Sequence, residues 1–149
     1  MLMGQNKLEN CKGLSGMINL QELNLYGNQL ISFGDLKGLS SLKKLNVGKN
    51  KLVTLANFPN LPALEVFDAS ENQITEGASP DGRKNELTNL ENCSKLNTLF
   101  MLGNPWVEEK GDDFKAEVLI ALIDLPIAFV NDLEETGTVS EEERADART

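Results

Sequence analysis

The segment LQELNLYGNQL, residues 20–30, decides the fold of this chain. Its pattern of leucines and one asparagine returns twice, and the successive asparagines Asn28, Asn50 and Asn72 lie 22 residues apart. The matching apolar positions are Leu42, Leu45, Val47 and Leu52 in the second unit, and Leu64, Phe67, Ala69 and Ile74 in the third. A unit this short cannot bury an apolar face alone, so neighbouring units must stack around a shared core. The sequence therefore predicts a solenoid.

Each unit predicts one short strand and an irregular return. In residues 23–25, Leu23 and Leu25 point into the core, while the alternate side chains point outward onto a concave face. The return carries an apolar residue at every third position, as at Leu30 and Phe33, which favours short 3-10 turns over long helices. We expect an α/β solenoid with a short parallel concave sheet, an irregular or 3-10 convex side and a C-terminal capping helix.

An asparagine follows each strand at the turn, where its amide can bond backbone groups that the bend leaves unpaired. The predicted structural ladder consists of Asn6, Asn28, Asn50, Asn72 and Asn104. The last interval of this ladder spans 32 residues, ten more than the others, so we place an insertion within residues 75–86. Ser-Pro-Asp-Gly at residues 79–82 predicts a turn inside it.

The chain divides into three predicted regions. Residues 1–106 hold about five repeats, residues 107–132 form a C-terminal cap, and residues 133–149 form an acidic helical tail. Ser140 to Glu143 is a capping box that begins the tail helix. Because this helix has almost no apolar face, it is either solvated or docked on a basic surface elsewhere.

Within the cap, one helix is predicted to begin near Asp112 or Asp113 and to be stopped by Pro126. The apolar face of this helix consists of Phe114, Val118, Leu119, Leu122 and Leu125. Phe129 and Val130 can pack back as a final strand. The helix would close the core of the last repeat.

The net charge of −9 is confined to the C-terminal segment. Residues 1–106 contain ten acidic and ten basic side chains, whereas residues 107–149 contain thirteen acidic and four basic ones. Phosphate binding needs a basic face, and an anionic membrane would repel the acidic segment, so we expect neither nucleic acid nor membrane as a partner. The sequence has no apolar run of membrane-spanning length and no secretory signal, which predicts a cytoplasmic location.

The residues predict no catalytic site, metal or cofactor. The chain contains no histidine, which is the common general base and zinc ligand. Glu65 and Asp68 are close together, but an open strand face provides no water-excluding pocket in which they could act. Cys11 and Cys93 fall in repeats three apart, too distant for a disulfide, so we expect reduced core thiols. We therefore predict that the chain is not an enzyme.

The unit L-x-x-L-x-L-x-x-N-x-L/I-x-x-L resembles the leucine-rich repeat over residues 2–104. It is similar to the short type found in the regulatory subunit of protein phosphatase 1 and in ciliary leucine-rich-repeat proteins. The cap motif of that group is matched by Asn104-Pro105, Phe114, Val118-Leu119 and Leu125-Pro126. This sequence departs from the motif in three ways. Phe114 replaces the usual tyrosine, the predicted helix is one turn longer than usual, and Asn131-Asp132 stands where leucine-aspartate is expected.

The tail segment from Val139 to Ala147 is similar to the acidic V-T-x-x-E-R-x-x-A segment of motile-cilium leucine-rich-repeat proteins, and the spacer before Leu87 resembles that of their radial-spoke member. This resemblance implies a structural subunit of an axonemal complex, such as the radial spoke, in a cilium or flagellum. A spliceosomal subunit and the axonemal dynein leucine-rich light chain have related caps and tails. A regulator that targets or gates a phosphatase is the second interpretation. A spliceosomal subunit is the third, and it would need a basic patch facing its partner.

The concave face is the predicted partner-binding site of a non-enzymatic protein-interaction scaffold. Its candidate residues are Tyr26, Asn24, Asn46, Val66, Asp68, Phe100 and Leu102. Val66, Phe100 and Leu102 would form an apolar patch, with Phe100 and Tyr26 as aromatic anchors. Either a partner segment or the chain's own tail covers this patch.

The sequence begins inside a repeat, since Met3, Asn6 and Leu8 already fit its columns. A terminal repeat normally carries a polar outer face, and this one does not. Either the chain is a piece of a longer solenoid or another protein covers this end. We expect the partners to be other proteins within a large assembly.

Overall fold

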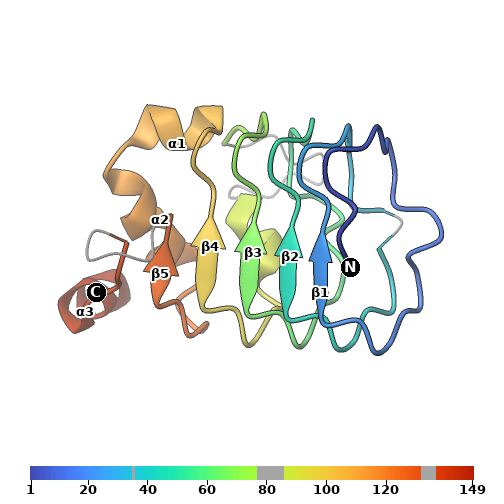
Figure 1. Ribbon diagram of the computed structural model, residues 1–149. Coiled ribbons are helices and arrows are strands. Elements are labelled where there is room, and N and C mark those ends of the chain that lie inside the picture. Colours follow the sequence, from blue (N-terminus) through green and yellow to red (C-terminus); the bar gives the residue numbers. More distant parts are fainter. Residues whose placement is uncertain (35, 77–85, 132–136) are drawn as a thin grey trace.

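The computed structural model describes residues 1–34, 36–76, 86–131 and 137–149 (Figure 1). At its centre is a parallel sheet of five strands that follow one another in chain order. The strands are β1 (Glu22–Asn24), β2 (Lys44–Asn46), β3 (Val66–Asp68), β4 (Thr98–Phe100) and β5 (Phe129–Val130). This sheet confirms the predicted solenoid. The predicted insertion and its turn lie outside the described residues except at Thr75, Glu76 and Glu86.

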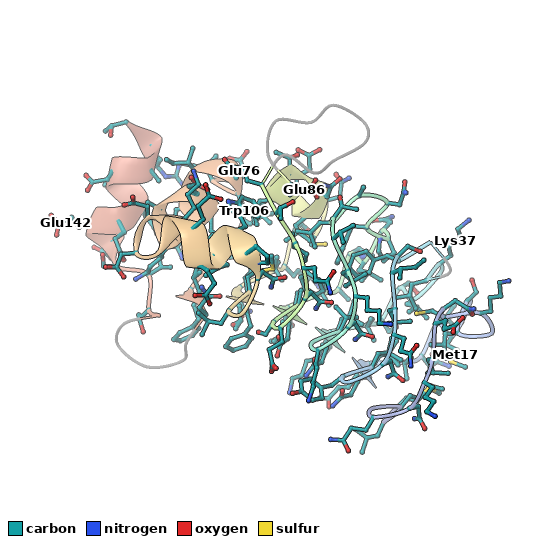
Figure 2. The ribbon with its side chains drawn as sticks, turned by 90° about the horizontal axis from the view of Figure 1, so that it is seen from above. Met17, Lys37, Glu76, Glu86, Trp106 and Glu142 are labelled. Carbon is teal, nitrogen blue, oxygen red and sulfur yellow. The ribbon has the colours of Figure 1, made fainter. Side chains whose placement is uncertain are left out.

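The strands pair in the register of the repeat. Leu23 lies opposite Leu45, Leu45 opposite Phe67, and Phe67 opposite Leu99. These central side chains are at most 2% exposed, while the side chains on either side of them point to the opposite face of the sheet. Viewed from above in Figure 2, Met17 and Glu142 lie at opposite ends of the stack.

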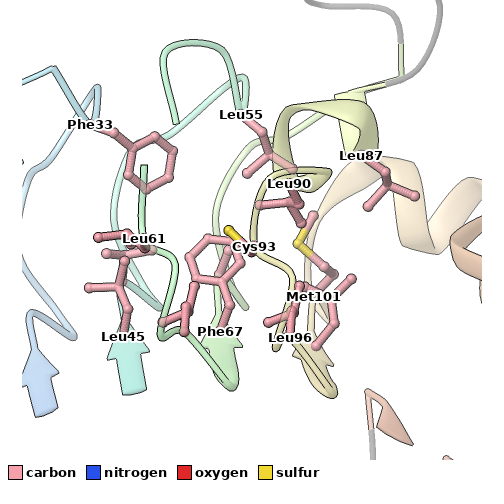
Figure 3. Packing of buried hydrophobic residues seen from close by; sticks show 14 of the residues in the cluster. Phe33, Leu45, Leu55, Leu61, Phe67, Leu87, Leu90, Cys93, Leu96 and Met101 are labelled. Atoms are coloured by element: carbon pink, nitrogen blue, oxygen red, sulfur yellow. The ribbon is translucent and has the colours of Figure 1, made fainter. Parts of the chain in front are cut away.

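The return segments close the core on the convex side (Figure 3). Between β1 and β4, the described return segments contain one 3-10 helix, η1 (Glu86–Leu90), and otherwise turns and irregular backbone. The Phe58 ring packs edge-to-face against Phe33 and Phe67, with centroid distances of 5.1 and 4.9 Å. The predicted irregular or 3-10 convex side is therefore present.

Buried asparagines connect neighbouring repeats. The Asn50 side-chain amide donates to the Val47 carbonyl at 2.8 Å and to the Leu25 carbonyl of the preceding repeat at 3.0 Å. Its Oδ1 accepts from the Leu30 backbone N–H at 2.9 Å. Equivalent bonds are made by Asn28, Asn72 and Asn104. The exposed Asn6 side chain instead donates within its own turn. Each buried asparagine thus holds two repeats at a fixed spacing.

Two helices cover the C-terminal end of the stack. The first, α1 (Pro105–Lys110), follows directly on the last repeat. The sequence does not predict it, because Trp106 stands at the repeat position that Leu30 occupies in the first full unit. The second, α2 (Asp113–Ala121), begins where the sequence predicts. The buried Trp106 and Phe114 rings meet edge-to-face at 5.4 Å, which packs the two helices together.

The end of α2 differs from the prediction, since the helix stops before Pro126 is reached. Leu122 leaves the helical conformation, with φ −116° and ψ 41°. The turns that follow bring Leu125 and Ile127 back against the core, at 7% and 0% exposure. The backbone turn at Leu122 therefore ends the helix.

The tail returns along the outer edge of β5, the predicted final strand. The Val130 N–H donates to the Gly137 carbonyl, and the Val139 N–H donates to the Ala128 carbonyl. These antiparallel bonds cover a strand edge that would otherwise be open to another chain.

The tail ends in α3 (Glu141–Arg148), which packs against α2. It begins with the predicted capping box, because the Ser140 side chain accepts from the Glu143 N–H and the Glu143 carboxylate accepts from the Ser140 N–H. The Lys115 ammonium of α2 lies 2.9 Å from the Glu143 carboxylate. The helix therefore docks on α2, where Lys115 provides a single basic contact rather than the basic surface that the prediction names.

Candidate partner-binding face

The solvent-facing side chains of the strands form the concave face. Strand pairing places them in three rows across the sheet. The first row contains Glu22, Lys44, Val66, Thr98 and Phe129, the second contains Asn24, Asn46, Asp68 and Phe100, and the third contains Tyr26, Gly48, Ser70 and Leu102. The structure thus brings the seven candidate residues together on one face.

Three of the candidate residues also close the ends of their own strands. Oδ1 of Asn24, Asn46 and Asp68 accepts from the backbone N–H two residues later, at 2.9, 2.8 and 2.9 Å. Side chains of this type favour such local bonds at turns. This role lies outside the sequence-based prediction, although the recurrence of Asn or Asp at one position of the repeat indicates it. The amide nitrogens of Asn24 and Asn46 remain as donors toward solvent.

Tyr26 spans three repeats across the rim of this face. Its hydroxyl donates to the Glu71 carboxylate at 3.1 Å. The ring crosses Gly48, where an added Cβ would lie only 3.0 Å from Tyr26 Cδ2, so the glycine makes room for the ring. The hydrogen bond to Glu71, then desolvation, then the charges of Glu71 and Asp68 raise the pKa of Tyr26. Tyr26 is therefore held in place rather than mobile on the surface.

The concave face is polar at its N-terminal end and apolar at its C-terminal end. Glu22 and Lys44 form an ion pair at 3.2 Å whose side chains are more than half exposed, so it contributes little to stability. At the other end lie four neighbouring apolar side chains, which we call the apolar patch. It consists of Val66, Phe100 and Phe129, which are half-buried, and Leu102, which is 51% exposed.

The first row departs from the expected alternation at Thr98. This side chain was expected to face solvent, yet it is 4% exposed because it lies between Val66 and Phe129, and its hydroxyl bonds Asn97 Oδ1 at 2.7 Å. Phe129 was not among the candidate residues, although its place in the predicted final strand puts it on this face. The patch is therefore more continuous than the sequence indicates.

The tail helix α3 lies away from β3 and β4, which carry most of the apolar patch (Figure 1). Figure 1 shows α3 beyond β5, at the C-terminal end of the sheet. Helix α3 packs against α2, and its Arg144 guanidinium donates to the Ile127 carbonyl. The segment before α3 lies nearer to the patch, because Thr138 pairs with Phe129. The choice between a partner and the chain's own tail over the patch therefore stays a prediction.

The cysteines are structural. Both are buried, and neither forms a disulfide. Burial raises the pKa of the Cys93 thiol to about 11, so this thiol stays protonated at neutral pH and packs as an apolar group. Across residues 1–34, 36–76, 86–131 and 137–149, no three His, Cys, Asp or Glu side chains gather as a metal site. In that same part of the chain, every helix is too short or too polar to cross a bilayer.

Comparisons with known proteins agree with this architecture. Residues 18–61 match a family model described as leucine-rich repeats in two copies. A search of curated protein sequences gives no match. The crystal structure of the Drosophila melanogaster SNF/U2A′ complex aligns with a TM-score of 0.63 at 19% identity, covering 86% of this chain and 66% of that one. An internalin from Listeria monocytogenes aligns with a TM-score of 0.55 at 22% identity, covering 89% of this chain and 42% of that one.

The chain has the fold of a leucine-rich-repeat solenoid. Its sequence spans less than two thirds of the chain in the SNF/U2A′ complex and less than half of the internalin. Identities of 19% and 22% show the fold alone. Neither structure is of a radial-spoke, axonemal or phosphatase protein, so these finer assignments stay predictions.

Proposed function

We propose that this chain is a non-enzymatic scaffold that holds a segment of a partner protein on the apolar patch of its concave face. The observation that carries the proposal is Leu102, 51% exposed next to Phe100 on a sheet whose other side already packs the core. One exposed leucine is ordinary for a soluble protein. Four neighbouring apolar side chains, two of them aromatic, form the kind of surface that a partner covers.

The two ends of the face set the chemistry of the partner. Apolar side chains of the partner would lie over Phe100, Leu102 and Phe129. Its carbonyl groups would accept from the amide nitrogens of Asn24 and Asn46, whose oxygens are already used by the backbone. The partner segment is therefore amphipathic along its length, with its apolar end over β4 and β5.

The test compares two variants as baits in an extract of the source cells. Phe100→Ala should fold like the wild type, because its side chain is only half-buried, and should retain roughly tenfold less of the wild-type partner. Val53→Ala, at a residue that is 48% exposed in the return segment after β2, should retain all of it. A Phe100→Ala chain that keeps the partner would refute the proposal. One that unfolds would place Phe100 in the core.

For the setting of this scaffold we keep the motile-cilium axoneme first, supported by the resemblance of the segment from Val139 to Ala147. A radial-spoke subunit should stay with the axoneme through a high-salt wash. A phosphatase-targeting regulator, the second interpretation, should exchange and should change the rate of a phosphatase. A spliceosomal subunit, the third, should co-purify with ribonucleoprotein.

A partner is also proposed over the first repeat. Leu2 is 87% exposed and pairs with Asn24 at the edge of β1, and Ile18 is 60% exposed. A further repeat of the same solenoid would cover these side chains equally well. Crosslinking at Lys7 separates the two, because only a partner gives a crosslink to a different chain.

A further inference from the structure

A second surface lies on the cap, in a groove of about 210 Å³ between α2 and α3. Its apolar lining comes from Ala116, Leu119 and Ile120 of α2 together with Ala147 of α3. Its rim carries Asp112, Glu143 and Asp146 together with one cation, Lys115, which is paired with Glu143. The groove belongs to the C-terminal end of the stack and shares no lining residue with the apolar patch.

The lining is apolar and open to solvent. Ile120 is 62% exposed although it follows the buried Leu119 on a helix that packs against the core. Ala116, one turn earlier, is exposed beside it. Ala147 packs against the core from the facing helix. Of the described large apolar side chains, Ile120 is thus one of the few left uncovered, and it lies in a groove rather than on a convex surface.

The charge around the groove is strongly negative. Residues 107–149 contain thirteen acidic and four basic side chains. Three of these four cations are occupied internally: Lys110 pairs with Glu76 and Glu117, Lys115 pairs with Glu143, and the Arg144 guanidinium donates to the Ile127 carbonyl. Within the described part of the chain, the carboxylates of Asp112 and Asp146 have no cationic partner.

We propose that this groove binds a basic segment of a partner protein. One apolar side chain of that segment lies over Ala116 and Ile120, and lysine or arginine side chains on either side of it reach Asp112 and Asp146. Charge complementarity selects a basic occupant, since an acidic segment would meet uncompensated carboxylates on both helices. A second copy of this chain is disfavoured because each copy carries a formal charge of −9.

The test uses two labelled synthetic peptides of about 15 residues, roughly four helical turns, and fluorescence anisotropy. The first has leucine at every third or fourth position and lysine elsewhere, and the second has glutamine in place of each leucine. The wild-type chain should bind the leucine peptide more tightly. Ile120→Ser changes an exposed position and should leave the helical circular dichroism unchanged. This variant should bind the leucine peptide roughly fivefold or more weakly, and its affinity for the glutamine peptide should stay the same.

Charge variants test the rim. The double variant Asp112→Asn/Asp146→Asn should bind both peptides more weakly, and this binding should depend less on salt. Asp124→Asn, an exposed acid of the cap outside the groove, is the matched control and should change little. Phe100→Ala should also bind normally, so failure here is distinguishable from failure of the concave-face proposal.

Three results would overturn the proposal. If Ile120→Ser binds both peptides like the wild type, or if Asp124→Asn weakens them as much as the rim variants do, only general attraction to an acidic protein is present. If sedimentation equilibrium shows a dimer that Ile120→Ser abolishes, the groove holds a second copy of this chain rather than a basic partner.

Discussion

At the scale of single residues, Glu86 is a buried acid that sequence analysis did not single out. It is 0% exposed, and its Oε2 accepts from the Thr54 hydroxyl and from the Leu55 backbone N–H, both at 2.7 Å. The Thr54 hydroxyl in turn accepts from the Ala56 N–H at 3.0 Å. This network ties η1 to the return segment that follows β2.

We predict that Glu86→Ala lowers the free energy of unfolding by about 1–3 kcal/mol, because it leaves the buried Leu55 N–H without an acceptor. Glu86→Gln should cost less, since its amide oxygen can still accept. Denaturant unfolding measures both, with Glu9→Ala at an exposed position as the control. Equal stability of Glu86→Ala and the wild type would mean that the network does not hold the repeat.

Tyr26 gives a prediction that can be read directly, because it is the only tyrosine of the chain. Its bond to Glu71 raises its pKa above 10.0 in the folded state. The folded state therefore binds the phenolic proton more tightly than the unfolded state, and the resulting stability is lost as the pH rises through that folded-state pKa. Ultraviolet titration should show the midpoint moving back toward 10.0 in Glu71→Gln but not in Glu65→Gln. An unchanged midpoint in Glu71→Gln would show that the hydrogen bond between Tyr26 and Glu71 does not raise the pKa of Tyr26.

At the scale of elements, α3 should detach when acidified. The Lys115 ammonium first, and then the Ser140 backbone N–H, hold the pKa of Glu143 below its ordinary value of 4.5. The stabilisation by this carboxylate is thus present above pH 4.5 and is lost as the pH falls below it. Hydrogen exchange of residues 141–148 should quicken there while Val118 in α2 stays protected. Glu143→Gln should exchange quickly at all pH values, and an acid-insensitive wild-type helix would contradict the prediction.

The elements that could be predicted from the sequence are those set by burial. Leu23, Leu45 and Phe67 recur at one spacing, and a buried column of this kind fixes both strand and register. The early end of α2 could not be predicted, because no glycine or proline stands at Leu122 and the turn is imposed by packing of the residues after it.

The outward-facing residues of the candidate site could be predicted from the sequence, but their contacts could not. Alternation indicates which side chains face outward, and it grouped Val66, Phe100 and Leu102 correctly on one face. Alternation does not give hydrogen-bond partners, so the strand-closing bonds of Asn24 and the burial of Thr98 were missed.

At the scale of the whole molecule, the stack of repeats and its cap carry two separate surfaces, the apolar patch and the groove. The apolar patch lies on the face of β3 to β5, and the groove lies between α2 and α3. Figure 1 shows α3 beyond β5, at the end of the sheet. A rigid solenoid that carries both can hold two partner segments at a fixed distance, because neither surface overlaps the other.

The most direct test of the concave-face account is site-specific photocrosslinking from Leu102. A photoreactive phenylalanine at this position, which is 51% exposed, should leave the fold intact. The same group at Val53, 48% exposed in the return segment after β2, is the control. We expect Leu102 to crosslink to one discrete protein in an extract of the source cells, Val53 not to crosslink to the same peptide, and Phe100→Ala to abolish the Leu102 crosslink. Crosslinks from Leu102 only within its own chain, or a partner captured equally in the Phe100→Ala background, would contradict this account.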